Sequence, residues 1–427
     1  MNNEQKQEQK EQEIALITEN EYLYKVIDNG RNHIINNQPL RIMIFGFGSA
    51  AKYLFDYLTT YAYQIEVIIC TRNVESAAGY VNCIRMAGSM RICNEILHTT
   101  IIPCDINDIV GVSQILEKWK PEIVVNTSRY WPGVKYGSKS WSQVRAYGFW
   151  SPISAVFPIR IAEAIKMSEI DTIFINTSYP DAVNRLIVEN GFKQTIFGAG
   201  NVNHIIPRFK NAMVKLWNAQ DNGRELHSCE FEIAIATSHY HDVLIGKEGI
   251  DEGCPILVTC IGISKEMQTT IPEVNAWIQA NYDLLLKECV VPFPGDATRN
   301  MMVASSCAQI IDKIIYAING QEMNTVVCIP GAFGNVGGYP VEFTVTSDNS
   351  VVVEISDVFA YSDMYKTNMA SIKGDGIDYV DKSIHFLTSD KFKKFCDTYV
   401  EIPEEVPYNK CEEYAKTVAT VVFGDAK

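Results

Sequence analysis

The chain has 427 residues, of which 47% are hydrophobic and 21% charged, and its formal net charge is -14. This length exceeds what one hydrophobic core usually supports, so two domains are expected. The negative charge argues against a nucleic-acid or anionic-membrane partner, and no apolar run has the length of a membrane span, so we expect a soluble cytoplasmic protein.

The N-terminal segment divides into two parts. Residues 1–12 are almost entirely Asn, Gln, Glu and Lys, which cannot bury enough apolar surface to fold, so they predict a disordered tail. In residues 13–35 several apolar side chains have a roughly helical spacing, which predicts an added helix before the first strand.

Residues 41–51 predict a buried strand, a glycine turn and the start of a helix. Gly46, Gly48 and Ala51 have the spacing G-x-G-x-x-A. In this motif the first glycine permits a tight turn, the second lets the backbone approach a pyrophosphate, and the small third residue allows close packing of helix on strand. The N–H groups at the helix start, with Ser49 and Ala50, would face the phosphates. The alternative is a βαβ unit without a ligand.

A second apolar strand, 65–70, ends in Thr71, Arg72 and Asn73. Many NAD-binding folds place an acidic residue here for the ribose 2′-hydroxyl. An arginine instead matches a 2′-phosphate in charge and in its bidentate geometry, so NADP is favoured over NAD. The alternative is a solvated loop arginine.

Two further strands, 99–104 and 122–126, alternate with helices. This alternation predicts a doubly wound parallel sheet with ligands beyond the carboxyl ends of its strands. The residues that follow these two strands are therefore also predicted to bind the cofactor: Asp105, Ile106, Asn126, Thr127 and Ser128.

Residues 129–147 predict a long loop rich in aromatic, glycine and cationic residues. A loop of this length is often a functional lid, and a solvated insertion is the alternative. The next strand, 171–176, ends in Asn176, whose amide could hold a substrate or the nicotinamide ribose. The alternative is a turn residue that caps the strand.

The pattern changes near residue 200. Strands at 230–237, 255–264, 325–329, 341–346 and 351–355, with a helix at 297–318, predict an antiparallel sheet with helices between its strands. We therefore predict an α/β N-terminal Rossmann domain over residues 13–200. Residues 201–427 are predicted to form an α+β substrate or catalytic domain.

The chain resembles the lactate/malate dehydrogenase-like superfamily of NAD(P)-binding proteins. Four segments carry the likeness: the turn 46–51; 175–181, similar to the family's Asn-Pro-x-Asp segment; 238–242, where the family has Gly-x-His-Gly-x; and 329–334 before 339–341. The resemblance implies hydride transfer between a nicotinamide cofactor and a carbonyl or alcohol, with a histidine as proton donor or acceptor. The segments 104–108 and 119–126 also look like saccharopine dehydrogenases and extended short-chain dehydrogenases, which use the same cofactor class.

The histidine of the resembled motif corresponds to either His239 or His241. If the segment is extended, the two side chains share a face, and one of them would be the acid/base. An ordinary strand-end pair is one alternative. A metal site with Asp242 or His204 is another, but no further ligand cluster accompanies it and the twelve cysteines contain no C-x-x-C pair. We therefore predict no metal.

The family's Asp-x-x-Arg pair corresponds only loosely to Asn203 and Arg208. Arg208 is the best candidate for a carboxylate clamp, with a surface helix arginine as the alternative. Loss of the aspartate would leave the catalytic histidine without its usual orienting carboxylate.

Together these features predict an NAD(P)-dependent oxidoreductase, NADP-preferring, acting on a small carbonyl, hydroxy or imine compound. One alternative is a saccharopine- or opine-type amino-acid dehydrogenase. Another is a non-catalytic nucleotide-binding sensor or scaffold. By analogy with the resembled families, a homodimer or higher homo-oligomer is expected.

Overall fold

The computed structural model describes ten segments of the chain: residues 24–27, 39–62, 64–92, 96–131, 137–220, 225–267, 269–318, 326–345, 351–396 and 402–423. The predicted tail over residues 1–12 lies outside them. No helix in these segments is long and apolar enough to cross a membrane.

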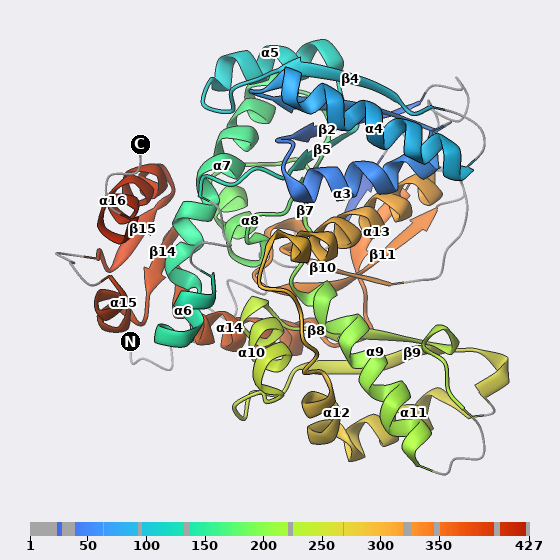
Figure 1. Cartoon of the computed structure of the whole chain (residues 1–427). Coiled ribbons are helices and arrows are strands. Elements are labelled where there is room, and N and C mark those ends of the chain that lie inside the picture. The colour runs from blue at the N-terminus through green and yellow to red at the C-terminus, as the bar shows by residue number, and fades with distance from the viewer. Residues whose placement is uncertain are drawn as a thin grey trace.

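A six-stranded parallel sheet forms the upper part of the molecule in Figure 1. Its spatial order is β4 (His98–Pro103), β3 (Ile65–Thr71), β2 (Leu40–Phe45), β5 (Ile123–Asn126), β6 (Ile173–Asn176) and β7 (Ile196–Gly198). Phe45 is in register with Asn126, and Asn126 with Asn176, so the strands end at one common edge. The predicted doubly wound parallel sheet is confirmed.

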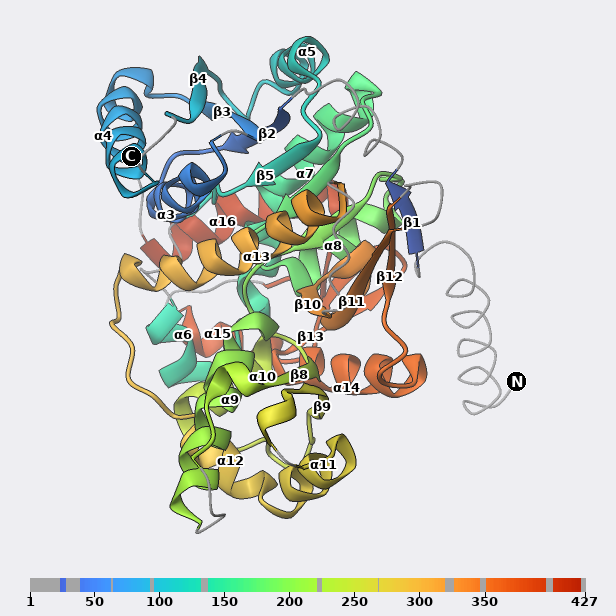
Figure 2. The same cartoon turned by 90° about the vertical axis from the view of Figure 1, so that its right-hand side faces the viewer.

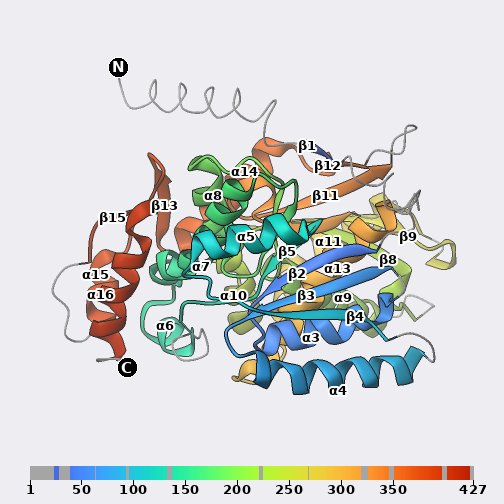
Figure 3. The same cartoon turned by 90° about the horizontal axis from the view of Figure 1, so that it is seen from above.

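Both faces of this sheet are covered by helices (Figure 3). Alternate side chains of β2 enter different cores, Ile42 and Ile44 on one face and Met43 and Phe45 on the other. One face packs against α3 (Ser49–Leu58), α4 (Val74–Ile92) and α13 (Asn300–Ile318), and the other against α5 (Ile109–Trp119), α7 (Ser151–Ser168) and α8 (Pro180–Glu189), while α16 (Cys411–Phe423) packs against α7. Burial on both faces explains why these strands are continuous apolar runs.

The later half of the chain, together with β1 from the N-terminal segment, forms three antiparallel sheets. They are β1 (Tyr24–Ile27) with β12 (Val351–Ile355), β11 (Gly338–Val345) and β10 (Val327–Pro330); β8 (Phe231–Ala236) with β9 (Leu257–Ile263); and β13 (Ile377–Val380), β14 (Ser383–Phe386) and β15 (Glu405–Pro407). The predicted α+β organisation after residue 200 is confirmed. The exact domain boundary stays a prediction.

The remaining helices surround these sheets (Figure 2). They are α6 (Gly137–Val144), α9 (Val202–Ala219), α10 (His239–Glu248), α11 (Ile271–Ala280), α12 (Tyr282–Glu288), α14 (Tyr361–Gly374) and α15 (Ser389–Phe395). In Figure 2, α9, α11 and α12 lie at the end of the molecule away from the six-stranded sheet.

Two local predictions are wrong. At Tyr24–Ile27 the segment predicted as a helix over 13–35 is instead a strand, β1, which pairs with β12. The other residues of that segment lie outside the described part of the chain. The loop predicted over 129–147 contains α6. In α6, Trp141 and Val144 are buried three residues apart, a helical spacing that the flanking glycines and cations concealed.

Candidate active site

The first half of the site is the turn between β2 and α3. Gly46 has a backbone φ of +89°, and a Cβ there would lie 2.2 Å from Ser128 Oγ, so glycine is required. Gly48 begins α3, and no described atom lies within 4 Å of where its Cβ would stand. Among the described residues no side chain caps α3. The turn therefore presents open backbone N–H groups, which is an arrangement suited to an anion.

A cavity of about 380 Å³ opens beside this turn. It lies beyond the ends of β2, β3, β4 and β5, where the strand order reverses and where open parallel sheets bind ligands. It brings together nine residues that were predicted to bind the cofactor: Gly46, Gly48, Thr71, Arg72, Asn73, Asp105, Ile106, Thr127 and Ser128. Residues separated by up to 82 positions in the sequence thus meet at one site.

The other four predicted cofactor residues are not among those that line the cavity. Ala51 is fully buried where α3 packs on the sheet. Asn126 is also buried, and its Oδ1 accepts a hydrogen bond from the Ser128 N–H at 3.0 Å. Ser49 Oγ accepts a hydrogen bond of 2.6 Å from the first residue of α13. Ala50 lies in the first turn of α3 and is partly exposed.

The residues that directly follow β3 line one side of the cavity, and none of them is a carboxylate. Thr71 and Asn73 already make local hydrogen bonds. Asn73 Oδ1 accepts a 2.9 Å hydrogen bond from the Ser76 N–H and so caps α4. Arg72 is exposed at the rim and makes no ion pair within the described part of the chain. Its guanidinium is therefore available to an anionic ligand.

The second half of the site is His239, the first residue of α10. Its Nδ1 lies 2.7 Å from Asp375 Oδ2. The rings of Tyr147 and Tyr179 pack edge-on against the imidazole, with centroids 5.1 and 4.8 Å away. The side chain is 17% exposed, and no described atom hydrogen-bonds Nε2. Nε2 is therefore the ring nitrogen that can meet a ligand.

Asp375 is held by three donors. Besides His239, the Tyr179 hydroxyl donates to Oδ2 and the Tyr147 N–H donates to Oδ1 at 2.7 Å. The carboxyl group is fully buried. Burial lowers the pKa of His239, but the charge and hydrogen bond of Asp375 outweigh it and the net pKa is raised. Asp375 is thus a carboxylate that orients the imidazole, in place of the aspartate that is missing from the Asp-x-x-Arg pair.

A second buried carboxyl group fixes the start of α10. The His239 N–H donates to Asp181 Oδ2 at 2.6 Å, and Asn201 Nδ2 donates to Oδ1 at 2.5 Å. Burial raises the pKa of Asp181 to about 6, against these hydrogen bonds and the nearby imidazole, which lower it. Asp181 lies in the first turn of α8, so His239 is tied to the segment that follows β6.

His241 occupies a different environment, because the segment is helical and not extended. Two positions apart on a helix the side chains point about 200° away from each other. His241 is 1% exposed, its Nδ1 lies 2.8 Å from Ser371 Oγ and its Nε2 lies 3.3 Å from the Asp251 carbonyl. Burial lowers the pKa of His241. This arrangement favours His239 as the residue that meets a ligand.

Arg208 is buried beneath α10. Its Nη1 donates to the carbonyl oxygens of Gly246 at 3.4 Å and Cys289 at 3.3 Å, and its guanidinium lies 4.3 Å from the Phe293 ring centroid. The guanidinium thus joins α10 to the end of α12. A clamp on a substrate carboxylate stays a prediction.

Next to Arg208, His204 Nδ1 lies 3.4 Å from Asp242 Oδ2. Burial raises the pKa of Asp242, but His204 and Arg208 outweigh this and lower it. Within the described segments, no three His, Cys, Asp or Glu side chains are grouped so that they could hold a metal ion.

Asn176 is fully buried at the end of β6. Its Oδ1 accepts hydrogen bonds from Asn126 Nδ2 at 3.2 Å and the Ser178 N–H at 2.9 Å, and its Nδ2 donates to Asn184 Oδ1 at 3.0 Å. These bonds join the ends of β5 and β6 to α8. Contact with a ligand stays a prediction for this residue.

The cavity and His239 lie along the same edge of the sheet. Arg129 lines the cavity and donates from Nη2 to the Thr177 carbonyl at 3.4 Å. Two residues further along, Tyr179 packs against the His239 ring. The structure therefore places the glycine turn and a histidine–carboxylate pair on neighbouring strand ends.

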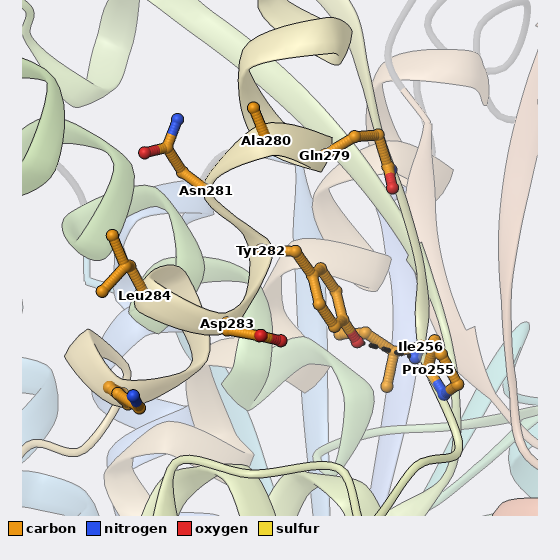
Figure 4. Close-up of a pocket in the computed structure, with 9 residues that line it drawn as sticks. Pro255, Ile256, Gln279, Ala280, Asn281, Tyr282, Asp283 and Leu284 are labelled. Carbon is orange, nitrogen blue, oxygen red and sulfur yellow. Dashed lines mark hydrogen bonds between the residues drawn. The ribbon is translucent and has the colours of Figure 1, made fainter.

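A second hollow, of about 580 Å³, lies between the α11–α12 turn and residues 255–256 (Figure 4). It contains no histidine or cysteine among its lining residues. The Tyr282 hydroxyl accepts from the Ile256 N–H at 3.0 Å and donates to Asp251 Oδ2 at 3.2 Å, so it is already engaged. The hollow offers less chemistry than the sheet edge.

Sequence reasoning missed Asp375, Tyr147 and Tyr179. Asp375 stands between two glycines and reads as a turn residue. The nearest cue is a glycine that packs against it, because a Cβ on Gly148 would lie 2.4 Å from the Asp375 carbonyl oxygen. Such a packing requirement becomes visible only in three dimensions.

The parallel sheet with a cavity at its strand-order reversal has the doubly wound α/β arrangement. No protein-family model matches the sequence, and no curated protein matches it. Malate dehydrogenase from Cryptosporidium parvum has a similar structure, with a TM-score of 0.50 and 11% identity over 79% of this chain and 96% of that chain. Lactate dehydrogenase from Eimeria maxima with NADH and oxamate gives 0.49 and 12% identity over 79% and 94%. The chain therefore has the lactate/malate dehydrogenase-like α/β fold.

Proposed function

We propose that the chain is an NAD(P)-dependent dehydrogenase that transfers a hydride to or from a small carbonyl or hydroxy compound. The observation that carries the proposal is the His239–Asp375 pair, with Nε2 accessible, on the same sheet edge as the glycine turn. Residues 13–200 would bind the cofactor and residues 201–427 would supply the substrate side. Cytoplasmic location and self-association remain predictions.

The cavity fits a dinucleotide in three respects. The space over Gly48 is open, the α3 N terminus has no side-chain cap among the described residues, and Arg72 stands free at the rim. The N–H groups at Ser49 and Ala50 would hold the pyrophosphate, and Arg72 would hold the 2′-phosphate of NADP. NADP is therefore our proposed cofactor, with NAD as the alternative.

When bound, the nicotinamide supplies a two-electron hydride donor or acceptor. His239 supplies the proton. In carbonyl reduction, protonated Nε2 donates to the carbonyl oxygen; in alcohol oxidation, neutral Nε2 takes the hydroxyl proton. Asp375 keeps a proton on Nδ1, orients the ring and stabilises the imidazolium. Tyr147 and Tyr179 exclude water from both sides of the ring.

Removing the Arg72 guanidinium should weaken NADPH binding about tenfold or more, because a charged hydrogen bond to phosphate contributes about 1.5–3 kcal/mol. NADH binding should change little, since NADH has no 2′-phosphate. Fluorescence titration of Arg72→Ala with both nucleotides measures the difference. Arg91→Ala is the control, because that guanidinium already pairs with Asp56 at 2.6 Å. Tighter NADH than NADPH binding by the wild type would contradict NADP preference.

Replacing Asp375 with asparagine should lower the pKa of His239. The carboxylate that contributes most to raising this pKa is lost, while the burial that lowers it remains, so the pKa should fall even though Asp181 and Asp242 still raise it. NMR titration of the imidazole, assigned by the signal missing in His239→Ala, measures it without a substrate. Asp363→Asn removes an exposed carboxyl group on α14 and serves as the control. An unchanged pKa in Asp375→Asn would refute the coupling.

A further inference from the structure

Two cysteines meet in the wall of the 380 Å³ cavity. Cys70 lies in β3 opposite Ile102 of β4, and Cys104 lies two residues after Ile102, directly past the end of β4. Positions two residues apart on a strand face the same side, and both side chains enter the core shared with α5 and α7. The two thiols lie close enough for each to influence the pKa of the other. Neither is in a disulfide.

We propose that Cys70 and Cys104 form a redox-active dithiol, which a peroxide oxidises to a disulfide between the ends of β3 and β4. Cys104 is the thiol that the oxidant reaches, because it is 8% exposed and Cys70 only 1%. The neighbouring Cys70 thiol lowers the pKa of Cys104, although burial opposes this effect. A lower pKa increases the fraction of reactive thiolate.

The chemistry balances with hydrogen peroxide as the oxidant. The Cys104 sulfur attacks one peroxide oxygen, so an S–O bond forms, the O–O bond breaks, and water leaves. The Cys70 sulfur then attacks the Cys104 sulfenic acid, so the S–S bond forms, the S–O bond breaks, and a second water leaves. Two thiols lose two electrons and two protons in total, and the peroxide is reduced to two water molecules.

The disulfide acts on the nucleotide cavity. An S–S bond is about 2.05 Å long, so forming it draws the two strand ends together. The adjoining residues Thr71 and Asp105 line the cavity and would shift with them. In this respect the inference rests on the proposed function, since a dinucleotide in the cavity would cover both thiols. Bound nucleotide and oxidation should therefore oppose each other.

The first measurement treats the full chain with hydrogen peroxide in the absence of nucleotide. Cleavage after glutamate places Cys70 in fragment 67–75, both Cys83 and Cys93 in 76–95, and Cys104 in 96–117. Mass spectrometry should find fragments 67–75 and 96–117 linked, with the loss of two hydrogens. Cys83→Ser, which removes an exposed thiol elsewhere, should leave this link unchanged. In Cys70→Ser the link should vanish, and a sulfenic-acid probe should label Cys104.

The second measurement repeats the oxidation with NADPH or NADH at about ten times its Kd, where linkage predicts roughly tenfold slower disulfide formation. Absence of the linked fragments in the first measurement would overturn the dithiol. Linked fragments that form equally fast with and without nucleotide would support the dithiol and contradict the proposed cofactor cavity. The two failures are therefore distinguishable.

Discussion

Turnover by His239→Ala should fall by about 10²- to 10⁴-fold relative to the wild type, because a positioned general acid/base contributes that much. The variant lacks the imidazole that pairs with Asp375 and whose Nε2 is accessible. NADPH binding should remain within about a factor of three, since His239 does not line the cavity at the glycine turn. Steady-state assays against panels of hydroxy acids, keto acids and amino acids, with nucleotide titrations in parallel, measure both effects.

Two further histidine variants separate a catalytic role from a structural one. His98→Ala removes an imidazole that is 73% exposed, and its turnover should match the wild type. His241→Ala should instead lower the free energy of unfolding, by roughly 1–3 kcal/mol, because it removes one of the two hydrogen-bond partners of the buried Ser371 hydroxyl. Full activity in His239→Ala would end the acid/base proposal. An amine requirement for turnover would select the opine-type alternative.

The cavity at the glycine turn could be predicted because its signals are local in sequence. A short apolar strand is followed within six residues by Gly46, Gly48 and Ala51. Gly46 permits the tight turn, Gly48 leaves the backbone open to approach, and Ala51 permits close packing of helix on strand. The parallel register then brings the other strand ends to the same edge without any further information. For this reason nine of the predicted residues line one cavity.

The histidine half could be predicted only in part. The residue type was identified, but the conformation was not, because Ser238 precedes a helix that begins at His239 and not an extended segment. Its partner Asp375 comes from the end of α14, and nothing in the local pattern joins the two segments. The contact depends on long-range packing of α6, α10 and α14, which periodicity along one segment cannot report.

The two glycines of the β2–α3 turn should respond oppositely to alanine in stability. At Gly48 the backbone φ is -81°, which alanine adopts readily, and no described atom crowds its Cβ. The free energy of unfolding of Gly48→Ala should therefore equal that of the wild type or exceed it by up to about 1 kcal/mol. Dinucleotide binding should nevertheless weaken about tenfold or more, since the added methyl group occupies the space where the pyrophosphate must approach the backbone.

Gly46→Ala should instead lower the free energy of unfolding by about 1–3 kcal/mol, because φ is +89° and the Cβ would lie 2.2 Å from Ser128 Oγ. Adding Ser128→Ala removes the steric contact but leaves the backbone strain, so the double variant should recover only part of the loss. Urea denaturation gives the stabilities, and fluorescence titration gives the affinities. If Gly48→Ala binds NADPH and NADH as tightly as the wild type, the open backbone at this turn does not face a pyrophosphate. The dehydrogenase proposal would then lose its cofactor site, whatever the behaviour of His239.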